Sequence, residues 1–326
     1  MRIHLQNPVD DRLFDFSETM WDAAVARAPD AGSGHVVSIG RTDADFALAM
    51  TEAEALICDV SVIKTQFPCP TPRLQLLFVT NAGLDRLAPF DWLPPRVILM
   101  NNRGTHAAKS GEFGIMAVLM LANRVPEMVT FQRAGRWHKL WGAVVTAQPI
   151  TIVGLGTLGG AVARHAAGFE MAVTGVRANP APHPHCARVI GVEELDAALR
   201  GTRFLVLACP LTDATRGLID RRRLDLLPEG AGVVNIGRGE LIDQEALCDR
   251  LDAGQLSGAV LDVFDPEPIP PGHRLWNTRN LIISPHTSAD DPATYNAISL
   301  DLFLENLSAW RNGQPLPNRF DIARGY

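Results

Sequence analysis

The sequence predicts an α/β protein built from two doubly wound units, each a parallel sheet with helices on both faces. Short apolar runs alternate with helical patterns in two separate series, one before residue 101 and one after residue 149. The chain has 326 residues. At about 150 residues per domain, this length leaves room for two domains.

The first series contains four apolar runs that are typical of buried parallel strands. These runs are residues 35–39, 55–58, 74–80 and 96–100. Between the first two runs, residues 42–50 begin with Thr42 as a plausible N-cap and continue in a helical pattern. Strands that alternate with helices indicate a parallel sheet covered on both faces.

The second series contains six such runs, and two long helices bracket it. The predicted strands are residues 150–153, 171–176, 204–208, 232–235, 257–261 and 281–284. The predicted bracketing helices are residues 110–124 and 291–311, and the Pro-, Gly- and Asn-rich tail 312–326 is expected to be loop. We therefore expect the chain to cross between domains twice. The first domain would comprise residues 1–100 plus 290–326, and the second residues 101–289.

Composition excludes several classes of protein. Hydrophobic residues make up 47% and charged residues 20%, as in a globular protein with a full core. No apolar run reaches the ~18 residues of a membrane span. The net charge of −6 gives no basic footprint for nucleic acid. The five cysteines are scattered without a C-x-x-C pair, which favours reduced thiols and a cytoplasmic location.

A glycine-rich segment is the strongest local signal. Gly154-x-Gly156-x-x-Gly159 directly follows a predicted strand and opens a predicted helix at 161–167. In a dinucleotide site the first glycine permits the tight turn, the second lets the backbone approach a pyrophosphate, and the third allows close helix–strand packing. The helix N-terminus supplies free N–H groups for the phosphates. The alternative is an ordinary strand–helix turn.

The end of the next predicted strand indicates which dinucleotide is preferred. NAD sites usually place an Asp or Glu about 20 residues after the glycines, where it accepts a hydrogen bond from the ribose. Here Arg177 stands at that strand end, 21 residues after Gly156. A guanidinium pairs well with a 2′-phosphate. We therefore expect NADP to be preferred, with NAD possible, unless Arg177 is only a solvent-exposed arginine.

Three more segments place a charged or titratable residue just after a predicted strand. They contain Arg238-Gly239, the D-V-F-D-P-E-P stretch with Glu267, and Pro285-His286. Ligands of open α/β sheets bind outside the carboxyl ends of the strands. Taken singly, these residues could be a surface arginine, a loop charge and an internally satisfied histidine. Together, after a dinucleotide loop, they indicate an active site.

These segments resemble the D-isomer-specific 2-hydroxyacid dehydrogenases. The Arg-Gly pair, the D-V-F-x-x-E-P segment and the final Pro-His all match, and the resemblance is strong over residues 101–286 and weaker before them. It implies a Rossmann cofactor domain inserted in a flavodoxin-like substrate domain. It also implies that Arg238, Glu267 and His286 are the catalytic residues.

The resemblance further implies which residues bind the cofactor. Asp262 would hold the nicotinamide carboxamide, and residues 208–212 would lie along the adenosine and pyrophosphate. The expected cofactor-binding residues are Gly154, Gly156, Thr157, Leu158, Gly159, Arg177, Ala208, Cys209, Pro210, Ile236, Gly237, Arg238, Asp262 and His286.

Substrate-binding residues follow in the same way. Asn81-Ala82-Gly83 resembles the family's substrate loop, usually Gly-Ala-Gly, in which the backbone N–H groups of Ala82 and Gly83 would bind the substrate carboxylate. Arg238 and His286 would also contact the substrate. Asn81 could also reach the pocket, or serve only as a turn residue. Trp141 lies in a segment that in relatives packs on a second subunit, so it is either a contact to the neighbouring active site of a homodimer or a packing residue.

The chemistry of these residue types is consistent with reduction of a 2-oxo acid. Such a reaction needs a hydride at the carbonyl carbon and a proton at its oxygen. Histidine is suited to that proton transfer near neutral pH. A carboxylate beside it stabilises imidazolium, and an arginine binds and polarises the substrate. Because the cofactor supplies the hydride, no metal is required. The segment His183-Pro184-His185-Cys186 lacks a fourth ligand, so we expect no metal site there.

The leading functional hypothesis is an NADP-preferring reductase of a small 2-oxo acid such as glyoxylate or hydroxypyruvate. A larger aromatic or branched 2-oxo acid is an alternative, because the divergent first domain contributes to the substrate pocket. A dinucleotide-sensing co-repressor without enzymatic activity is a second alternative. Formate dehydrogenases share the fold but lack the glutamate that this chain has as Glu267.

Overall fold

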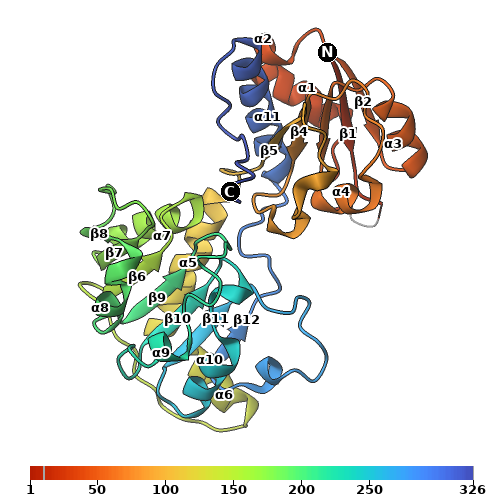
Figure 1. Cartoon of the computed structure of the whole chain (residues 1–326). Coiled ribbons are helices and arrows are strands. Elements are labelled where there is room, and N and C mark those ends of the chain that lie inside the picture. The colour runs from red at the N-terminus through yellow and green to blue at the C-terminus, as the bar shows by residue number, and fades with distance from the viewer. Residues whose placement is uncertain (10–11, 326) are drawn as a thin grey trace. The chain divides into compact units, whose positions relative to one another are not determined.

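The computed structural model describes residues 1–9 and 12–325, so residues 10, 11 and 326 lie outside the description. The chain divides into two units, Met1–His106 with Asp291–Tyr326, and Ala107–Asp290 (Figure 1). The expected domain boundaries lie at 100/101 and 289/290. The first unit extends to residue 106 because Asn101 and Asn102 hydrogen-bond to the 80–82 segment of the same unit.

The first unit is built on a five-stranded parallel sheet in the order β2-β1-β3-β4-β5. Its strands are β1 (Arg2–Gln6), β2 (Val36–Gly40), β3 (Ala55–Cys58), β4 (Leu76–Val79) and β5 (Ile98–Asn101). This is the flavodoxin-like order. The sequence did not predict β1. Its Ile3 and Leu5 alternate with His4 and Gln6, a pattern usual for a half-exposed strand, but all four side chains are buried.

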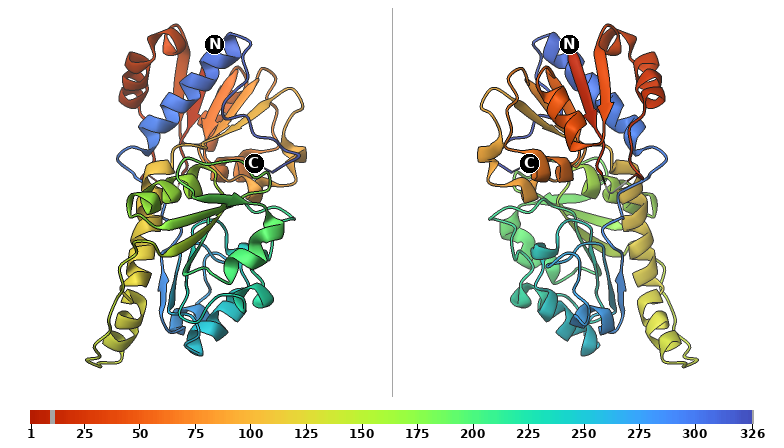
Figure 2. Two further views of the ribbon diagram at one scale, coloured as in Figure 1. Left: turned by 90° about the vertical axis from the view of Figure 1, so that its left-hand side faces the viewer. Right: turned by 90° about the vertical axis from the view of Figure 1, so that its right-hand side faces the viewer.

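Helices cover both faces of this first sheet. One face packs on α1 (Glu18–Arg27), α2 (Pro29–Gly32) and α11 (Tyr295–Arg311), and Figure 2 shows α11 running across it. The other face packs on α3 (Asp43–Met50) and α4 (Val60–Gln66). Thr42 caps α3 as predicted, because its side chain accepts a hydrogen bond from the N–H of Asp45. The tail returns to the sheet through an antiparallel bridge between Met100 and Arg319.

The second unit is built on a seven-stranded parallel sheet in the order β12-β11-β10-β9-β6-β7-β8. Its strands are β6 (Pro149–Val153), β7 (Ala172–Val176), β8 (Arg188–Ile190), β9 (Phe204–Leu207), β10 (Gly232–Asn235), β11 (Gly258–Leu261) and β12 (Leu281–Ile283). Counted within the unit, this is the dinucleotide-binding order with one strand added at an edge. The sequence did not predict β8, which has only three residues and follows a proline-rich loop.

The helices of the second unit form two layers. The first layer contains α5 (Ala107–Ala122), α6 (Val125–Arg133) and α7 (Thr157–Gly168), and the second α8 (Leu195–Leu199), α9 (Arg221–Leu224) and α10 (Gln244–Asp252). Successive strand residues alternate between the two cores, as Ile152 and Val153 illustrate. Helices α5 and α7 pack closely, since a Cβ at Gly114 would lie 2.4 Å from Val162.

Short 3-10 helices complete the structure. They are η1 (Asp85–Leu87), η2 (Phe90–Trp92), η3 (Val192–Glu194), η4 (Gly239–Leu241) and η5 (Arg274–Asn277). Within residues 1–9 and 12–325, no single helix has the length and apolarity to cross a membrane, and α5 and α6 meet that test only as a pair bent by 66°. The predicted fold class is confirmed: two doubly wound parallel sheets, the second inserted in the first.

Candidate active site

The glycine loop between β6 and α7 has the shape that a pyrophosphate requires. Gly154 has a φ of +94°, and a Cβ there would lie 2.6 Å from the backbone N and Cα of Cys209. A Cβ at Gly159 would lie 1.8 Å from the carbonyl oxygen of Gly154. At Gly156, in contrast, no protein atom lies within 4 Å of the Cβ position. Space is therefore open above the middle glycine, where the backbone of a dinucleotide site approaches its ligand.

The start of α7 offers donors to that space. Gly156 is the N-cap of α7 and brings no side-chain hydrogen bond, whereas Thr42 and Asp243 cap α3 and α10 with their side chains. The N–H groups of a first helical turn have no intrahelical acceptor. Thr157 and Leu158 therefore stand where a pyrophosphate accepts hydrogen bonds from a helix N-terminus. The residues present fit a dinucleotide.

Arg177 directly follows β7. Its backbone N–H donates to the carbonyl of Ile190 on β8 at 3.1 Å. Its side chain is half-buried, and among the described residues no carboxylate pairs with its guanidinium. Arg188 on the next strand is ion-paired with Glu194. Arg177 is thus the arginine of this strand end whose charge is not already balanced by an acid.

A histidine lies beside this arginine. A Cβ on Gly160 in α7 would lie 3.4 Å from Nε2 of His183. Burial lowers the pKa of His183, and the neighbouring charges of His185 and Arg177 lower it further. No group of three or more His, Cys, Asp or Glu side chains that could hold a metal ion occurs among the described residues.

The loop after β9 packs against the glycine loop. Thr215 fixes its shape, because Oγ1 donates to the carbonyl of Pro210 at 2.8 Å and accepts from the N–H of Thr212 at 2.7 Å. Cys209 is buried within this loop. Burial raises the pKa of its thiol to about 12. The thiol stays protonated at neutral pH, so Cys209 is not an activated nucleophile.

Asn235, the last residue of β10, holds the loop that contains Arg238. Its Oδ1 accepts from the N–H of Gly237 at 3.0 Å, and its Nδ2 donates to the carbonyl of Arg238 at 2.8 Å. The Arg238 side chain is half-buried, and its Nη1 donates to the carbonyl of Gly237 at 2.7 Å. A Cβ at Gly239 would lie 2.1 Å from the carbonyl carbon of Phe264. Glycine therefore lets this loop pack directly on the backbone that leads to Glu267.

Gln244 in α10 fixes the approach to Glu267. Its Nε2 donates to the carbonyl of Asp265 at 2.6 Å, and its Oε1 accepts from the N–H of Asp265 at 3.3 Å. Glu267 itself is mostly buried, with 14% of its side chain exposed. The carboxylate of Glu267 can therefore bind a side chain from a neighbouring loop.

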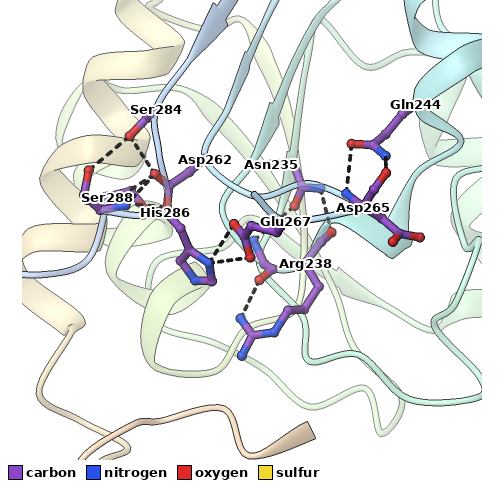
Figure 3. Close-up of polar contacts among 11 residues, drawn as sticks. Asn235, Arg238, Gln244, Asp262, Asp265, Glu267, Ser284, His286 and Ser288 are labelled. Carbon is purple, nitrogen blue, oxygen red and sulfur yellow. Dashed lines mark hydrogen bonds and ion pairs between the residues drawn. The ribbon is translucent and has the colours of Figure 1, made fainter. Parts of the chain in front are cut away.

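His286 provides that side chain. Its Nδ1 lies 2.9 Å from Oε1 and 3.0 Å from Oε2 of Glu267 (Figure 3). The contact requires a proton on Nδ1, which leaves Nε2 as the nitrogen that can face a substrate. The His286 side chain is 41% exposed, so a ligand can reach it. In Figure 3, Glu267 lies between the His286 ring and the Arg238 side chain.

The backbone at His286 is held in an uncommon conformation. Its φ is +56°, in the left-handed region that non-glycine residues rarely occupy. Such a conformation persists only when the surroundings fix it. Here the N–H of His286 donates to the carbonyl of Asp262 at 2.9 Å. The carboxylate of Asp262 fixes the residues on either side.

Asp262 therefore has a structural role besides the one that the resemblance implies. Its carboxylate is buried and accepts from four donors: Ser284 Oγ, Thr287 N, Ser288 N and Ser288 Oγ. A carboxylate has about four acceptor positions. The carboxylate of Asp262 therefore positions the loop that carries His286, and its contact with the nicotinamide carboxamide stays a prediction.

The loop expected to bind substrate lies in the first unit, directly after β4. The side chain of Asn81 turns toward α4, where its Oδ1 accepts from the N–H of Val60 at 2.8 Å. Neither the N–H of Ala82 nor that of Gly83 donates a hydrogen bond to another described residue. In the second unit, Trp141 lies between α6 and β6 and is 80% exposed.

The structure adds site residues that sequence reasoning missed. Asn235 holds the loop of Arg238, Gln244 holds the backbone of Asp265 in the loop that leads to Glu267, and Ser284 and Ser288 donate to Asp262. Asn235 had a signal, since it is a polar residue that ends a buried apolar strand, three residues before Arg238. The other three lie in loops or at a helix start where such residues are common.

Comparison with known proteins identifies the family. A family model described as "D-isomer specific 2-hydroxyacid dehydrogenase, NAD binding domain" matches residues 115–288, more than half of the chain. The chain belongs to the D-isomer-specific 2-hydroxyacid dehydrogenases. The resemblance inferred from the motifs is therefore confirmed, and this dehydrogenase is an NAD(P)-dependent oxidoreductase.

Individual relatives agree with this assignment. The dehydrogenase is 30% identical to a glyoxylate reductase of Korarchaeum cryptofilum over 76% of each chain. It is 30% identical to the human glyoxylate reductase/hydroxypyruvate reductase, over 83% of this chain and 84% of the human one. A D-isomer specific 2-hydroxyacid dehydrogenase from Xanthobacter autotrophicus, solved with NADPH and MES, superposes with a TM-score of 0.81 at 28% identity, over 99% of each chain.

Proposed function

We propose that this dehydrogenase reduces a small 2-oxo acid of the glyoxylate or hydroxypyruvate class to the D-2-hydroxy acid, with NADPH as the preferred cofactor. The contact between His286 Nδ1 and both oxygens of Glu267, at the carboxyl end of the cofactor-binding sheet, is the observation that supports it most. Relatives named glyoxylate reductase support the substrate class.

Three side chains perform the protein's share of the reaction. The cofactor, when bound, supplies the hydride that the carbonyl carbon accepts. His286 donates the proton on Nε2 to the developing alkoxide. Glu267 accepts from Nδ1–H and stabilises the imidazolium before that transfer, while it also fixes the ring orientation. Arg238 binds the carboxylate or the carbonyl oxygen of the substrate through charge-assisted hydrogen bonds. Water or bulk acid then returns a proton to His286.

The preference for NADPH rests on Arg177. Its guanidinium has no described acidic partner at the strand end where NAD enzymes usually place a carboxylate. A 2′-phosphate is a suitable partner for it. The related Xanthobacter structure was determined with NADPH, which is consistent with this assignment.

The first unit contributes the substrate carboxylate site. We assign this role to the free N–H groups of Ala82 and Gly83, because successive backbone amides form anion-binding sites. The side chain of Asn81 is held by α4, so its contribution comes through the backbone.

A homodimer is the assembly that the surface supports. Trp137 and Trp141 are 95% and 80% exposed, and Met116 and Phe169 border an apolar groove on α5 and α7. Exposed apolar surface of this kind marks an interaction site. We propose that a second copy covers it and that Trp141 reaches the active site of that copy. Light scattering of the purified protein tests the dimer, and a cytoplasmic location is consistent with its five free thiols.

A panel of 2-oxo acids tests the proposed activity. Glyoxylate, hydroxypyruvate, phenylpyruvate and a branched 2-oxo acid are each assayed with NADPH and with NADH, and kcat/KM is determined for every pair. Highest kcat/KM with glyoxylate or hydroxypyruvate and NADPH is expected. A maximum with phenylpyruvate would replace the substrate class, and no turnover with any of them would refute the proposed function.

A further inference from the structure

The substrate loop is held by its carbonyl groups. The carbonyl oxygen of Thr80 accepts from the hydroxyl of Tyr295 and, at 2.9 Å, from Nδ2 of Asn102. The next carbonyl, that of Asn81, accepts from the N–H of Asn102 at 3.1 Å. The one after it, that of Ala82, accepts from Nδ2 of Asn101 at 2.6 Å. Three successive carbonyls therefore point toward protein donors.

Because a peptide group is planar, these contacts to the carbonyl groups also determine where the following N–H groups point. In a trans peptide the C=O of one residue and the N–H of the next lie in one plane and point in opposite directions. Fixing the carbonyl of Asn81 therefore fixes the N–H of Ala82, and fixing the carbonyl of Ala82 fixes the N–H of Gly83. Both N–H groups point away from Asn101 and Asn102, and neither has a described protein acceptor.

The donors form a buried and internally connected network. Asn102 is fully buried, and its Nδ2 also donates to Oγ of Ser299 at 2.8 Å. Ser299 in turn donates to the carbonyl of Tyr295 at 2.7 Å, and Oδ1 of Asn102 accepts from Thr105 at 2.6 Å. The network thus ties the first turn of α11 to the loop after β4. Buried networks whose members are satisfied hold one geometry.

The two polar groups of the Asn101 side chain differ in their hydrogen bonding. Its Oδ1 is buried without a hydrogen-bond partner among the described residues, while its Nδ2 donates to Ala82. An unsatisfied buried acceptor is costly. An apolar residue of the same shape would avoid that cost, so the presence of an amide here is explained by the bond that its N–H makes to the loop.

From this arrangement we infer that Asn101 and Asn102 are positioning residues that aim the N–H groups of Ala82 and Gly83 at the substrate carboxylate, and that Tyr295 anchors the start of the same loop at Thr80. The inference rests on the proposed function, because it takes that carboxylate as the anion bound by the loop. These residues contact the loop and not the substrate, so they act on substrate affinity. Cofactor affinity is left unchanged.

Two variants and a matched control test the inference. Tyr295→Phe removes only the hydroxyl that reaches Thr80, and Asn101→Leu keeps the branching of the side chain at Cγ while it removes the donor to Ala82. Asn306→Leu is the control, since Asn306 is also a buried asparagine of the first unit, but its side chain bonds to Leu302 and Asn318 and not to residues 80–83. Melting temperatures establish that each variant is folded.

The readouts separate positioning from general structure. Oxalate, a dianion of glyoxylate's size, is titrated calorimetrically into the NADPH-saturated enzyme. A neutral hydrogen bond is worth about 0.5–1.5 kcal/mol, so each loop variant should raise the oxalate Kd by about 2–10-fold. The KM for glyoxylate should rise by a similar factor, with kcat and the Kd for NADPH within twofold of wild type. The control should leave all four values near wild type.

Other results would overturn the inference. Unchanged oxalate and glyoxylate affinities in both loop variants would do so, as would equal losses in the control. Wild-type enzyme that binds no oxalate would show that the loop is not an anion site. Failure of the proposed function would give another result: the enzyme would turn over no 2-oxo acid, but it would still bind oxalate, and Tyr295→Phe would still lower the affinity for oxalate.

Discussion

Nδ1 of His286 lies 2.9 Å and 3.0 Å from the two carboxylate oxygens of Glu267. The two residues come from the loops after β11 and β12. Gln244 holds the first loop at Asp265, and Asp262, at the start of that loop, holds the second through Thr287 and Ser288. The two loops are therefore tied to each other. Because Glu267 accepts from Nδ1–H, the proton to be transferred in the proposed reaction resides on Nε2.

Replacing His286 by alanine should abolish reduction but leave cofactor binding largely intact. Loss of a positioned acid–base group costs about 10²–10⁴-fold in rate. The measurement is kcat with glyoxylate, together with the Kd for NADPH from fluorescence titration. Near wild-type kcat would refute the assignment of His286.

Replacing Glu267 by glutamine should lower kcat and leave cofactor binding unchanged. The carboxylate accepts from Nδ1–H of His286 and stabilises the charged imidazolium, which a neutral amide does less well. A hydrogen bond to a charged group contributes about 1.5–3 kcal/mol, so kcat should fall by about 10–100-fold. The measurements are kcat with glyoxylate and the Kd for NADPH, and a wild-type kcat would contradict the pairing.

Replacing Asp262 by asparagine should impair catalysis through His286. The amide nitrogen of asparagine cannot accept from Ser288, whose N–H and hydroxyl both donate to Asp262. Hydrogen bonds to a charged group contribute about 1.5–3 kcal/mol each, so both Tm and kcat should fall. Ser284→Ala removes a single donor to the same carboxylate and should have a smaller effect. A wild-type kcat in Asp262→Asn would refute the role of Asp262 in positioning His286.

His4 should make the stability of the protein depend on pH. It is buried on β1, with Nε2 2.8 Å from Oε1 of Gln6 and Nδ1 2.8 Å from Oγ of Ser38. Burial lowers the pKa of His4 below its usual 6.5. As the pH falls, the unfolded chain therefore binds this proton first, and the stabilisation present above about pH 6.5 is progressively lost.

Thermal unfolding tests the role of His4. Tm measured at pH 7.5 and 5.5 should fall less on acidification in His4→Gln than in the wild type, because the variant has no titrating group there. Hydrogen bonds from the backbone N–H groups of Thr42 and Arg41 lower the pKa of Asp45, which faces His4, to about 2, well below this window, so Asp45 does not confound the comparison. Equal decreases in both proteins would remove His4 as the cause.

Much of the fold could be predicted because apolar runs end where buried parallel strands end. Residues 55–58 and 232–235 were predicted with the bounds that β3 and β10 have. β1 was missed because its polar residues, His4 and Gln6, are buried by pairing with each other, and no pattern of polarity shows such pairing. β8 was missed because three residues are too few to show a period.

The site was partly predictable for a related reason. Arg238, Glu267 and His286 follow strand ends, where a parallel sheet places its ligands. The contacts of Asp262 with the serines of the following loop could not be predicted, because they join residues more than 20 positions apart in the sequence. The hydrogen bond that anchors the start of the substrate loop joins Tyr295 to Thr80. Residues so far apart in the sequence form no local motif, so this contact could not be predicted.

Arg177→Asp should reverse the cofactor preference, or nearly so. A charge-assisted hydrogen bond is worth about 1.5–3 kcal/mol, or about 10–100-fold in KM for NADPH. The aspartate would also repel the 2′-phosphate and offer an acceptor to the 2′-hydroxyl of NADH.

KM for both cofactors is measured in wild type, in Arg177→Asp and in a control, Arg188→Asp, which alters an arginine already paired with Glu194. The control should keep the NADPH/NADH ratio of the wild type. If the wild-type enzyme prefers NADH, Arg177 is only a surface residue. If Arg177→Asp leaves the NADPH/NADH ratio of KM unchanged, the 2′-phosphate is instead bound by Arg164 or Arg188.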